Sequence, residues 1–357
     1  MIELASKDIV QRNYLIYRIA RFISVFGYKR LAKPHVEFHC DLKRLKKEEK
    51  AVYLYTGLHK SLWETAGILV AMILEGLPLA FVGMGDNLVR GKFYHTLARK
   101  TGIFLIKRAT NRKEILESAR KLKEYIINYI AYGADVLFFP EGTRKSILSE
   151  GKYGKFFPAA FEALLEYEKN KEDILKRYED LQAYTSYIIP VNVDYSKIRE
   201  DSEMLETYQK GKPRTLHIKD SLKMVKNIGD TYISFGNPIK VADNLDKNRK
   251  ELSAYVREKS LELVKILPIN IVSRAIVDSV EGDRIKTGKI ETNIARIIRK
   301  LSNLKDRFRG FAAEDHPRDI VEKVVKYEKN FKQEQMEIHK LPFYRLYADY
   351  IGHYLAG

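Results

Sequence analysis

Cysteine is nearly absent from this sequence, since Cys40 is the one cysteine among 357 residues. A single thiol cannot form an intramolecular disulfide, which excludes a fold held by disulfide bonds and fits a reducing compartment. His35 and His39 precede Cys40 and Asp41 follows it, but this spacing matches no standard set of metal ligands. We therefore expect no metal site there, and an ordinary strand or loop instead.

A long uninterrupted apolar run is also missing. The best candidate for a membrane span, residues 65–83, is broken by Glu75, Gly76 and Pro78. Each piece is shorter than the roughly 20 residues that a span requires, so we expect a helix followed by a strand. Residues 1–8 lack a basic region followed by an apolar stretch, and we expect no signal peptide. If the protein meets a membrane, we expect it to lie on the surface.

Acidic residues are fewer than basic ones. The chain has 47 Asp and Glu and 64 Lys and Arg, which gives a formal net charge of +17 at pH 7. Such an excess attracts an anionic partner, such as nucleic acid, acidic phospholipid, a phosphorylated metabolite or an acidic protein. The charge alone does not choose among these. The 45% of apolar residues is typical of a folded chain and excludes a disordered one.

Apolar runs alternate with helical patterns from residue 51 onward, which predicts an α/β layer fold. We expect a mixed sheet flanked by helices. The expected strands are 52–58, 79–82, 103–106, 136–139, 187–193 and 231–235. The expected helices between them are 62–74, 92–100, 111–132 and 158–184, the third from apolar residues at three- and four-residue steps.

The chain divides into three parts on this reading: an N-terminal helical segment (1–45), an α/β domain (46–266) and an all-helical C-terminal region (267–357). A basic helix over 6–30 either lies in a membrane interface or packs on the core, and both readings stay open. The tail is expected to form helices over 269–280, 290–308 and 319–337. The aromatic stripe in 341–355 is expected to belong to the core.

Three residues follow the first buried strand closely: His59, Ser61 and Glu64. Ser61 and Glu64 have the spacing of a capping box, so an ordinary capped helix with an incidental histidine is one reading. The other reading is functional. Histidine is the side chain best suited to take a proton near neutral pH, and a carboxylate beside it fixes its tautomer.

Charged clusters follow two more strands, Lys107 and Arg108 after 103–106 and the run Glu141 to Arg144 after 136–139. Ligands of α/β sheets bind at the edge where the strands end. Lys107, Arg108, Arg144 and Lys152 are therefore candidates to converge on one phosphate, although each alone would be read as a surface charge. Pro190 lies inside an expected strand and predicts an edge or a bulge.

Taken in order, these segments resemble the four sequence blocks of the glycerolipid acyltransferase superfamily. The first block, His-x-x-x-x-Asp, is read from His59 to Glu64, with Glu in place of Asp. The second, Gly-x-x-Phe-x-Arg-Arg, is similar to residues 102–108, with Lys107 replacing the first Arg and Phe104 one position early.

The third block, Phe-Pro-Glu-Gly-Thr-Arg-Ser, is matched by residues 139–144, with Lys145 where Ser is expected. The fourth, an apolar strand with a central proline, fits residues 188–193. The four blocks cover about half of the chain. Their common order makes the resemblance specific where one block alone would be weak.

The resemblance implies that His59 is a general base and Glu64 its partner. It implies a glycerol-phosphate site formed by Lys107, Arg108, Glu141, Gly142 and Arg144. From the same loops we add Ser61, Thr143 and Lys152 as candidate substrate-binding residues. No metal or organic cofactor is implied, since the acyl donor is a thioester of coenzyme A or acyl carrier protein.

Residues 85–88, 99–102 and 342–345 resemble the PlsB-type glycerol-3-phosphate acyltransferases in particular. We therefore expect transfer of a fatty-acyl group to the sn-1 hydroxyl of glycerol-3-phosphate, which makes lysophosphatidic acid for phospholipid biosynthesis. The alternative acceptor is 1-acylglycerol-3-phosphate, whose product is phosphatidic acid. The enzyme is expected to work at the cytoplasmic side of a membrane, in peripheral contact with anionic lipid.

Two readings from other classes stay open. A nucleic-acid-binding protein would use the positive charge but would leave the clusters at the strand ends unexplained, and we expect no nucleic acid partner. A lipid-binding protein that has lost catalysis would account for Glu64 in place of Asp.

Overall fold

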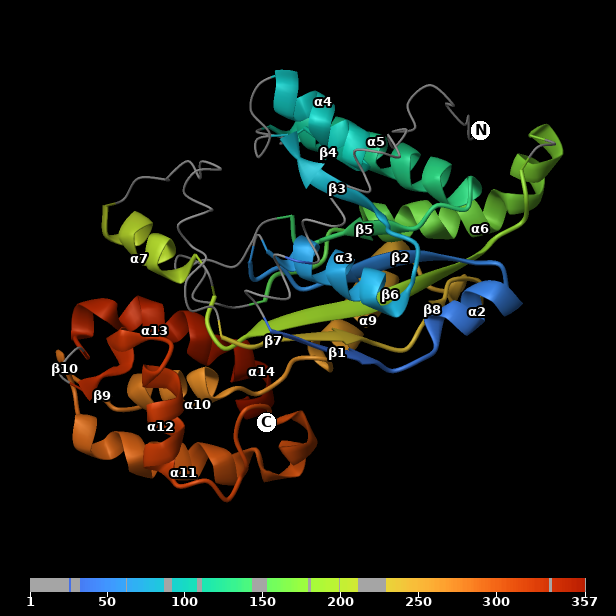
Figure 1. The fold of residues 1–357 in the computed structure, drawn as a ribbon. Coiled ribbons are helices and arrows are strands. Elements are labelled where there is room, and N and C mark those ends of the chain that lie inside the picture. Colours follow the sequence, from blue (N-terminus) through green and yellow to red (C-terminus); the bar gives the residue numbers. More distant parts are fainter. Residues whose placement is uncertain are drawn as a thin grey trace.

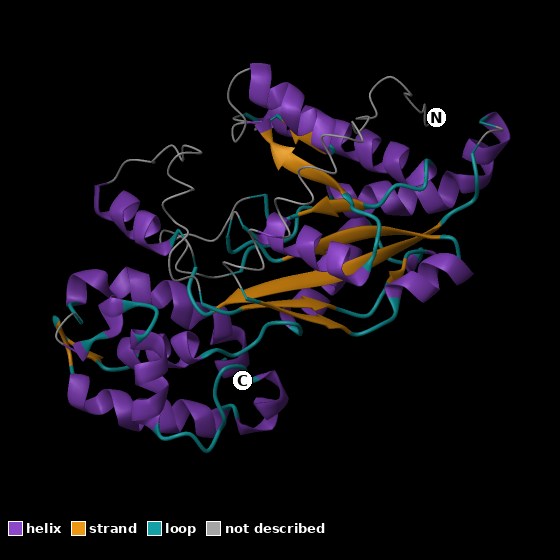
Figure 2. Cartoon of the chain, in the orientation of Figure 1, coloured by secondary structure: helices purple, strands orange, loops and turns teal. Residues whose placement is uncertain are grey.

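The computed structural model describes residues 26, 33–61, 63–86, 92–107, 111–142, 153–178, 181–198, 200–210, 229–333 and 336–356. Figure 1 shows a central sheet with helices on both faces and the C-terminal helices gathered at one end of it. Figure 2 shows that the strands form one layer, whereas the C-terminal region is almost entirely helical. The predicted α/β fold with a C-terminal helical region is confirmed.

The sheet is mixed, as predicted. Within the described ranges its strands are β1 (Pro34–Phe38), β2 (Ala51–Gly57), β3 (Phe81–Gly85), β4 (Ile103–Ile106), β5 (Val136–Phe138), β6 (Thr185–Tyr195), β7 (Thr231–Phe235) and β8 (Ile239–Lys240). They lie in the order β1-β7-β6-β2-β5-β3-β4, and β8 pairs with β6. The strands β2 to β6 run parallel to their neighbours among themselves, so their carboxyl ends share one edge.

The sheet is buried on both faces, which is why its strands appear in the sequence as continuous apolar runs. All seven residues of β2 are buried. One face is covered by α5 (Arg112–Ala131), α6 (Ala159–Arg177) and α9 (Arg249–Leu261), which lie side by side (Figure 1). The other face packs on α3 (Glu64–Glu75) and on the C-terminal helices. Three further helices, α2 (Leu42–Glu48), α4 (Lys92–Thr101) and α7 (Asp201–Lys210), lie at the margins.

The helix α5 follows its predicted bounds closely because Asn111 caps it, accepting a hydrogen bond from the Glu114 amide at 3.0 Å. Its second half is buried. Its first turns are not, since the side chains of Ile115 and Leu116 are 55% and 65% exposed. The predicted apolar stripe therefore begins later along the helix than the sequence suggested.

The C-terminal region contains α10 (Pro268–Val277), α11 (Ile290–Lys300), α12 (Pro317–Val325), α13 (Leu341–Ala348) and α14 (Gly352–Leu355). The last two predicted helices end early, at Lys300 and Val325, where 3-10 turns replace them. The expectation that no strand follows residue 267 is wrong, because β9 (Val280–Glu281) and β10 (Arg284–Ile285) form a short hairpin.

The aromatic stripe of the tail lies in the core, as predicted. Phe343, Tyr347 and Tyr350 are buried. Tyr347 donates its hydroxyl to Asp201 at 2.6 Å and accepts the Ile198 amide at 3.0 Å. The tail is thereby fixed to the segment that follows β6.

The predicted helix over 6–30 lies outside the described residues, apart from Phe26. Residues 34–38 form β1 and a bend follows at His39 and Cys40, so the expected strand or loop is a strand followed by a bend. His35 pairs with Asp230 and His39 with Glu37, in each case at 3.1 Å, and both pairs lie at the surface. Within the described ranges, no helix has the length and apolarity needed to cross a membrane.

Pro190 was predicted to mark an edge or a bulge, and the edge is wrong. The strand β6 is internal, with β2 on one side and β7 and β8 on the other. On that second side, β8 pairs with residues up to Ile188 and β7 with residues from Val191 onward. Pro190 therefore stands opposite the turn between β7 and β8, where no ladder donor is required, and its carbonyl accepts the Gly236 amide at 2.8 Å.

Candidate active site

The site begins where β2 ends. A Cβ on Gly57 would lie 1.7 Å from the Val191 carbonyl oxygen, so only glycine allows the strand to leave the sheet here. The loop then places His59 so that its Nδ1 lies 2.7 Å from Oε2 of Glu64, the first residue of α3. The two residues that the sequence singled out as base and partner are in direct contact.

His59 is held on its other sides as well. Its ring stacks on Phe139, with centroids 4.5 Å apart and planes 15° apart. Its side chain is 16% exposed, whereas that of Glu64 is fully buried. Because Nδ1 faces Glu64, Nε2 lies on the opposite side of the ring. Nε2 is therefore the ring nitrogen that does not face Glu64, and an imidazole nitrogen of this kind can accept a proton when the other carries one.

Burial raises the pKa of the Glu64 carboxyl well above its usual range, because a charge there has no contact with water. The amide of Lys60, which donates to Glu64 Oε1 at 2.6 Å, acts in the opposite direction. The position at the start of α3 also favours a negative charge, since helix N-termini carry partial positive charge. A carboxylate so placed stabilises the imidazolium that forms when His59 accepts a proton.

The predicted capping box is absent. The helix begins at Glu64 itself, and Trp63 before it provides no side-chain cap. The hydroxyl of Ser61 accepts the Trp63 amide at 3.1 Å and donates to Glu200 at 2.9 Å. The Glu64 side chain contacts His59 instead, and the buried Ser61 connects its loop to the segment after β6.

Glu141 connects two loops at the carboxyl edge of the sheet. Its Oε1 accepts the amide of His59 at 2.9 Å, and its Oε2 accepts the amide of Gly154 at 2.8 Å. The side chain is buried, and a Cβ on Gly154 would lie only 3.1 Å from Oε2. The structure therefore gives Glu141 the task of fixing the His59 loop. Its contact with a substrate stays a prediction.

The remaining predicted residues are only partly described. Gly142 is exposed and has a φ of +69°, a value that favours glycine. Arg108, Thr143, Arg144 and Lys152 lie outside the described residues. Lys107 directly follows β4; its side chain is 60% exposed, and its Nζ lies 3.2 Å from Glu114.

Lys107 and His59 belong to different strands of the same edge. Between β2 and β4 stand β5 and β3. Because neighbouring strands lie about 4.8 Å apart, the ends of β2 and β4 are separated by roughly 14 Å. The structure thus brings His59, Ser61, Glu64 and Glu141 together and leaves Lys107 at the far side of that edge.

Sequence reasoning missed a buried polar cluster next to His59. It consists of Lys60 from the loop, Asn192 and Asp194 from β6, and the rings of Tyr153 and Tyr350. A signal was present, because Asn192 and Asp194 alternate within an apolar strand and so share one face of it. The sequence contains no such signal for Lys60, since a lysine in a polar loop is normally solvated.

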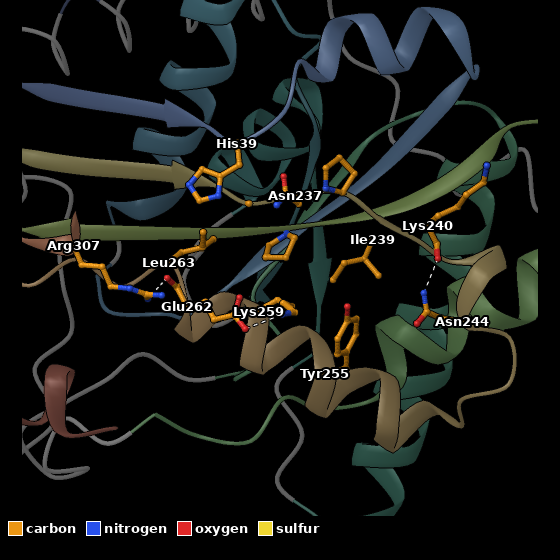
Figure 3. Close-up of a pocket in the computed structure, with 13 residues that line it drawn as sticks. His39, Asn237, Ile239, Lys240, Asn244, Tyr255, Lys259, Glu262, Leu263 and Arg307 are labelled. Carbon is orange, nitrogen blue, oxygen red and sulfur yellow. Dashed lines mark hydrogen bonds and ion pairs between the residues drawn. The ribbon is translucent and has the colours of Figure 1, made fainter. Parts of the chain in front are cut away.

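A cleft of about 460 Å³ lies apart from this cluster, between the turn after β7 and the end of α9 (Figure 3). It contains Lys240, Lys259 and Arg307, but two of these cations already have a carboxylate partner. Lys240 lies 2.9 Å from Glu49, and Lys259 lies 2.8 Å from Glu262. The cleft is therefore far less positive than its lysine and arginine content suggests.

The chain is similar to known acyltransferases. The family model described as Acyltransferase matches residues 35–194, a span that includes His59, Glu64 and Glu141. In solved structures, the chain is similar to the 1-acyl-sn-glycerophosphate acyltransferase PlsC from Thermotoga maritima. That likeness has 15% identity and a TM-score of 0.39, over 69% of this chain and 78% of the other.

Two curated relatives are glycerol-3-phosphate acyltransferases. The protein of Baumannia cicadellinicola subsp. Homalodisca coagulata is 27% identical over 209 residues, which are 56% of this chain and 23% of the relative. The protein of Pseudoalteromonas atlantica is 22% identical over 213 residues, 58% of this chain and 24% of the relative. The chain therefore spans about a quarter of the length of these curated relatives.

Proposed function

We propose that this chain is an acyltransferase of the glycerolipid acyltransferase superfamily and that it transfers a fatty-acyl group to the sn-1 hydroxyl of glycerol-3-phosphate. The donor is a thioester of coenzyme A or acyl carrier protein, and the product is lysophosphatidic acid. The single observation that carries the proposal is the contact between His59 Nδ1 and Glu64, 2.7 Å long, at the carboxyl edge of the sheet. The choice of acceptor is supported by the two curated relatives, both glycerol-3-phosphate acyltransferases.

The reaction follows from this contact. The acceptor hydroxyl gives its proton to His59 Nε2 while its oxygen attacks the carbonyl carbon of the thioester. Glu64 stabilises the imidazolium through Nδ1. The tetrahedral intermediate then collapses, the carbon–sulfur bond breaks, and the proton held by His59 passes to the departing thiolate. Atoms and charges balance without a serine nucleophile, because the attacking hydroxyl belongs to the substrate.

The acceptor's phosphate requires cations near the site. We assign this task to Lys107, Arg108, Arg144 and Lys152, the basic residues of the strand-end loops. Lys107 is the one that the structure describes, and its partner Glu114 lies at the surface, where an ion pair is weak and easily exchanged for a phosphate. The ~14 Å between the strand ends leaves room for a bound glycerol phosphate between Lys107 and His59.

We further propose that the protein works in peripheral contact with an anionic membrane, at its cytoplasmic side, where the lipid product is delivered. The start of α5 supports this proposal. Ile115 and Leu116 are largely exposed there, next to the exposed cations Arg112 and Lys113. Apolar side chains flanked by basic ones are typical of helices that lie on anionic lipid. The net charge of +17 acts in the same direction.

The test of the acceptor is product analysis with labelled palmitoyl-CoA and palmitoyl-acyl carrier protein. Glycerol-3-phosphate and 1-acylglycerol-3-phosphate are offered in separate reactions. We expect a monoacyl product from glycerol-3-phosphate. Product from the acylated acceptor alone would contradict the proposed acceptor and make this a 1-acylglycerol-3-phosphate acyltransferase. No product from either acceptor, with folded protein and lipid present, would leave a binding role, and salt-dependent binding of duplex DNA would then point to nucleic acid.

A further inference from the structure

Lys60 is a fully buried lysine beside the proposed base. Its side chain is 1% exposed. The ammonium donates to Asn192 Oδ1 at 2.9 Å and forms a close ion pair with Asp194. The rings of Tyr153 and Tyr350 lie 5.7 and 5.4 Å from Nζ, so aromatic faces complete the surroundings of the charge.

Asp194, the anionic partner of Lys60, has further hydrogen bonds of its own. Asp194 accepts a hydrogen bond from the side-chain amide of Asn192 at 2.5 Å and one from the backbone amide of Lys265 at 2.7 Å. Asn192 and Asp194 are both buried. A buried ion pair seldom adds net stability over apolar residues of the same size, so its retention calls for another reason.

The backbone of Lys60 provides that reason. Its amide donates to Glu64 Oε1 at 2.6 Å, and His59 precedes it directly in the chain. One residue therefore contacts the partner of the base through its backbone and strand β6 through its side chain. Movement of the Lys60 side chain would move the amide that holds Glu64.

The C-terminal region closes the buried side of the cluster. Tyr350 comes from the 3-10 turn η9 (Asp349–Ile351) and stacks on Tyr153, with ring centroids 5.8 Å apart. Tyr153 lies beside Gly154, whose amide binds Glu141. The loop that contains Tyr153 and the loop that contains Lys60 therefore both contact Tyr350 of the tail.

We propose that Lys60 is a positioning residue for the His59–Glu64 pair, and that its buried ion pair with Asp194 fixes the loop against β6 and the C-terminal tail. The inference rests on the proposed role of His59 as base, and it is independent of which acceptor is used. Lys60 takes no part in proton transfer. It keeps the carboxylate of Glu64 within hydrogen-bond distance of Nδ1, and a shift of about 1 Å there would lower the rate strongly.

The test compares two matched pairs of substitutions in the full chain. The first removes both buried charges, Lys60→Met with Asp194→Asn, which avoids leaving one charge unpaired. The control is Lys46→Met with Asp135→Asn, a lysine–aspartate pair 2.6 Å apart near the start of β2. This control pair lies at the end of β2 opposite His59, so it matches the loss of an ion pair without touching the loop.

Two readouts are taken from each variant. We expect kcat to fall at least a hundredfold in the Lys60/Asp194 variant, with KM for either substrate changed less than threefold, while the control stays within threefold of wild type in both. In nuclear magnetic resonance of ¹⁵N-labelled histidine, the proton on His59 Nδ1 should be hydrogen-bonded in wild type and control. Its resonance should broaden or shift upfield in the Lys60/Asp194 variant.

The two readouts separate this inference from the proposed function. If wild type transfers no acyl group to any acceptor, the proposed function fails, and the Nδ1 resonance still decides the role of Lys60. An unchanged Nδ1 resonance in the Lys60/Asp194 variant would overturn the inference. So would a kcat within threefold of wild type.

Discussion

At His59, one carboxylate, that of Glu64, contacts two groups at once. One oxygen of Glu64 lies 2.7 Å from His59 Nδ1, and the other accepts a hydrogen bond from the Lys60 amide. The related sequence block has aspartate at this position, one methylene shorter. The loop here is built around the longer side chain, because α3 begins at Glu64 and the carboxylate reaches back to both groups.

Substitutions of Glu64 test this geometry. Glu64→Gln keeps the shape but replaces one acceptor oxygen with a donor, so it cannot satisfy both contacts. We expect kcat to fall about a thousandfold, comparable in kind to losses in catalytic triads whose acid is changed to an amide. Glu64→Asp should lie between Gln and wild type, since it keeps the charge and loses reach. Steady-state kinetics of both variants provide the measurement.

The expected fall in kcat of Glu64→Gln should not come from unfolding of the protein. Burial raises the pKa of this carboxyl, so its ionised form destabilises the fold at neutral pH, and a neutral amide removes that penalty. Thermal unfolding midpoints of variant and wild type should agree within a few degrees. A large drop in the midpoint would assign the rate loss to the fold instead.

At the scale of single elements, Glu141 joins the loop after β2 to the loop before α6. Glu141→Gln leaves one of the two backbone amides, those of His59 and Gly154, without an acceptor. A buried donor left unpaired costs about 1–3 kcal/mol, so the free energy of unfolding should drop by that amount. We also expect kcat to fall about tenfold or more, as the His59 loop loosens.

Chemical denaturation and initial-rate assays measure both effects of Glu141→Gln. A useful comparison is Ser61→Ala, which removes the buried link to Glu200 but leaves the amide of His59 paired. If Glu141→Gln kept full stability and lost only affinity for the acceptor, Glu141 would contact the substrate and would not serve to fix the loop.

The start of α5 carries the prediction on membranes. Ile115→Ser with Leu116→Ser removes the exposed apolar pair but keeps Arg112 and Lys113. We expect binding to phosphatidylglycerol vesicles to weaken about tenfold or more in sedimentation assays, because apolar side chains provide much of the affinity. The control is Leu74→Ser, an apolar residue of α3 that is 42% exposed. Equal binding by all three proteins would remove α5 from the membrane contact.

The order of helices and strands could be predicted from the sequence because a strand buried on both faces leaves a continuous apolar run. The segments that became β4 and β7 were predicted with their observed ends. The strands β8, β9 and β10 have two residues each, too few to show a period. The strand β1 is only partly buried, so its sequence has no continuous apolar run. The predicted ends of the helices in the tail were wrong because 3-10 turns continue the same apolar spacing.

The site was predicted in part. His59 and Glu64 were found because a base and an acid five residues apart follow a buried strand. The capping box was an error of spacing, since Ser61 contacts the distant Glu200 and Glu64 contacts His59. Lys60 could not be found, because its partners Asn192 and Asp194 lie more than 130 positions away in the chain. Sequence patterns do not show which distant residues meet.

At the scale of the whole molecule, the tail and the α/β core are coupled through His353. Burial lowers the pKa of this imidazole to about 4, and the nearby charge of Lys60 acts in the same direction. In the unfolded chain the pKa is close to 6.5. Between pH 6.5 and 4 the unfolded chain therefore binds a proton that the folded chain does not, so stability falls as the pH falls through this window.

His353→Phe should remove that dependence. The shift corresponds to about 3 kcal/mol lost by wild type between pH 6.5 and 4, and the variant should lose that much less. Denaturant unfolding of both proteins at several pH values gives the comparison. Identical slopes of stability against pH for the two proteins would show that His353 is solvated and that the tail does not bury it.

We propose that His59 is the general base of an acyl transfer to glycerol-3-phosphate. The most direct measurement is the rate of acyl transfer from labelled palmitoyl-CoA to glycerol-3-phosphate by wild type and His59→Ala, both shown to be folded. We expect lysophosphatidic acid from wild type and a rate lowered at least a thousandfold in the variant. A variant as active as wild type would contradict it, because some other group would then have to take the proton.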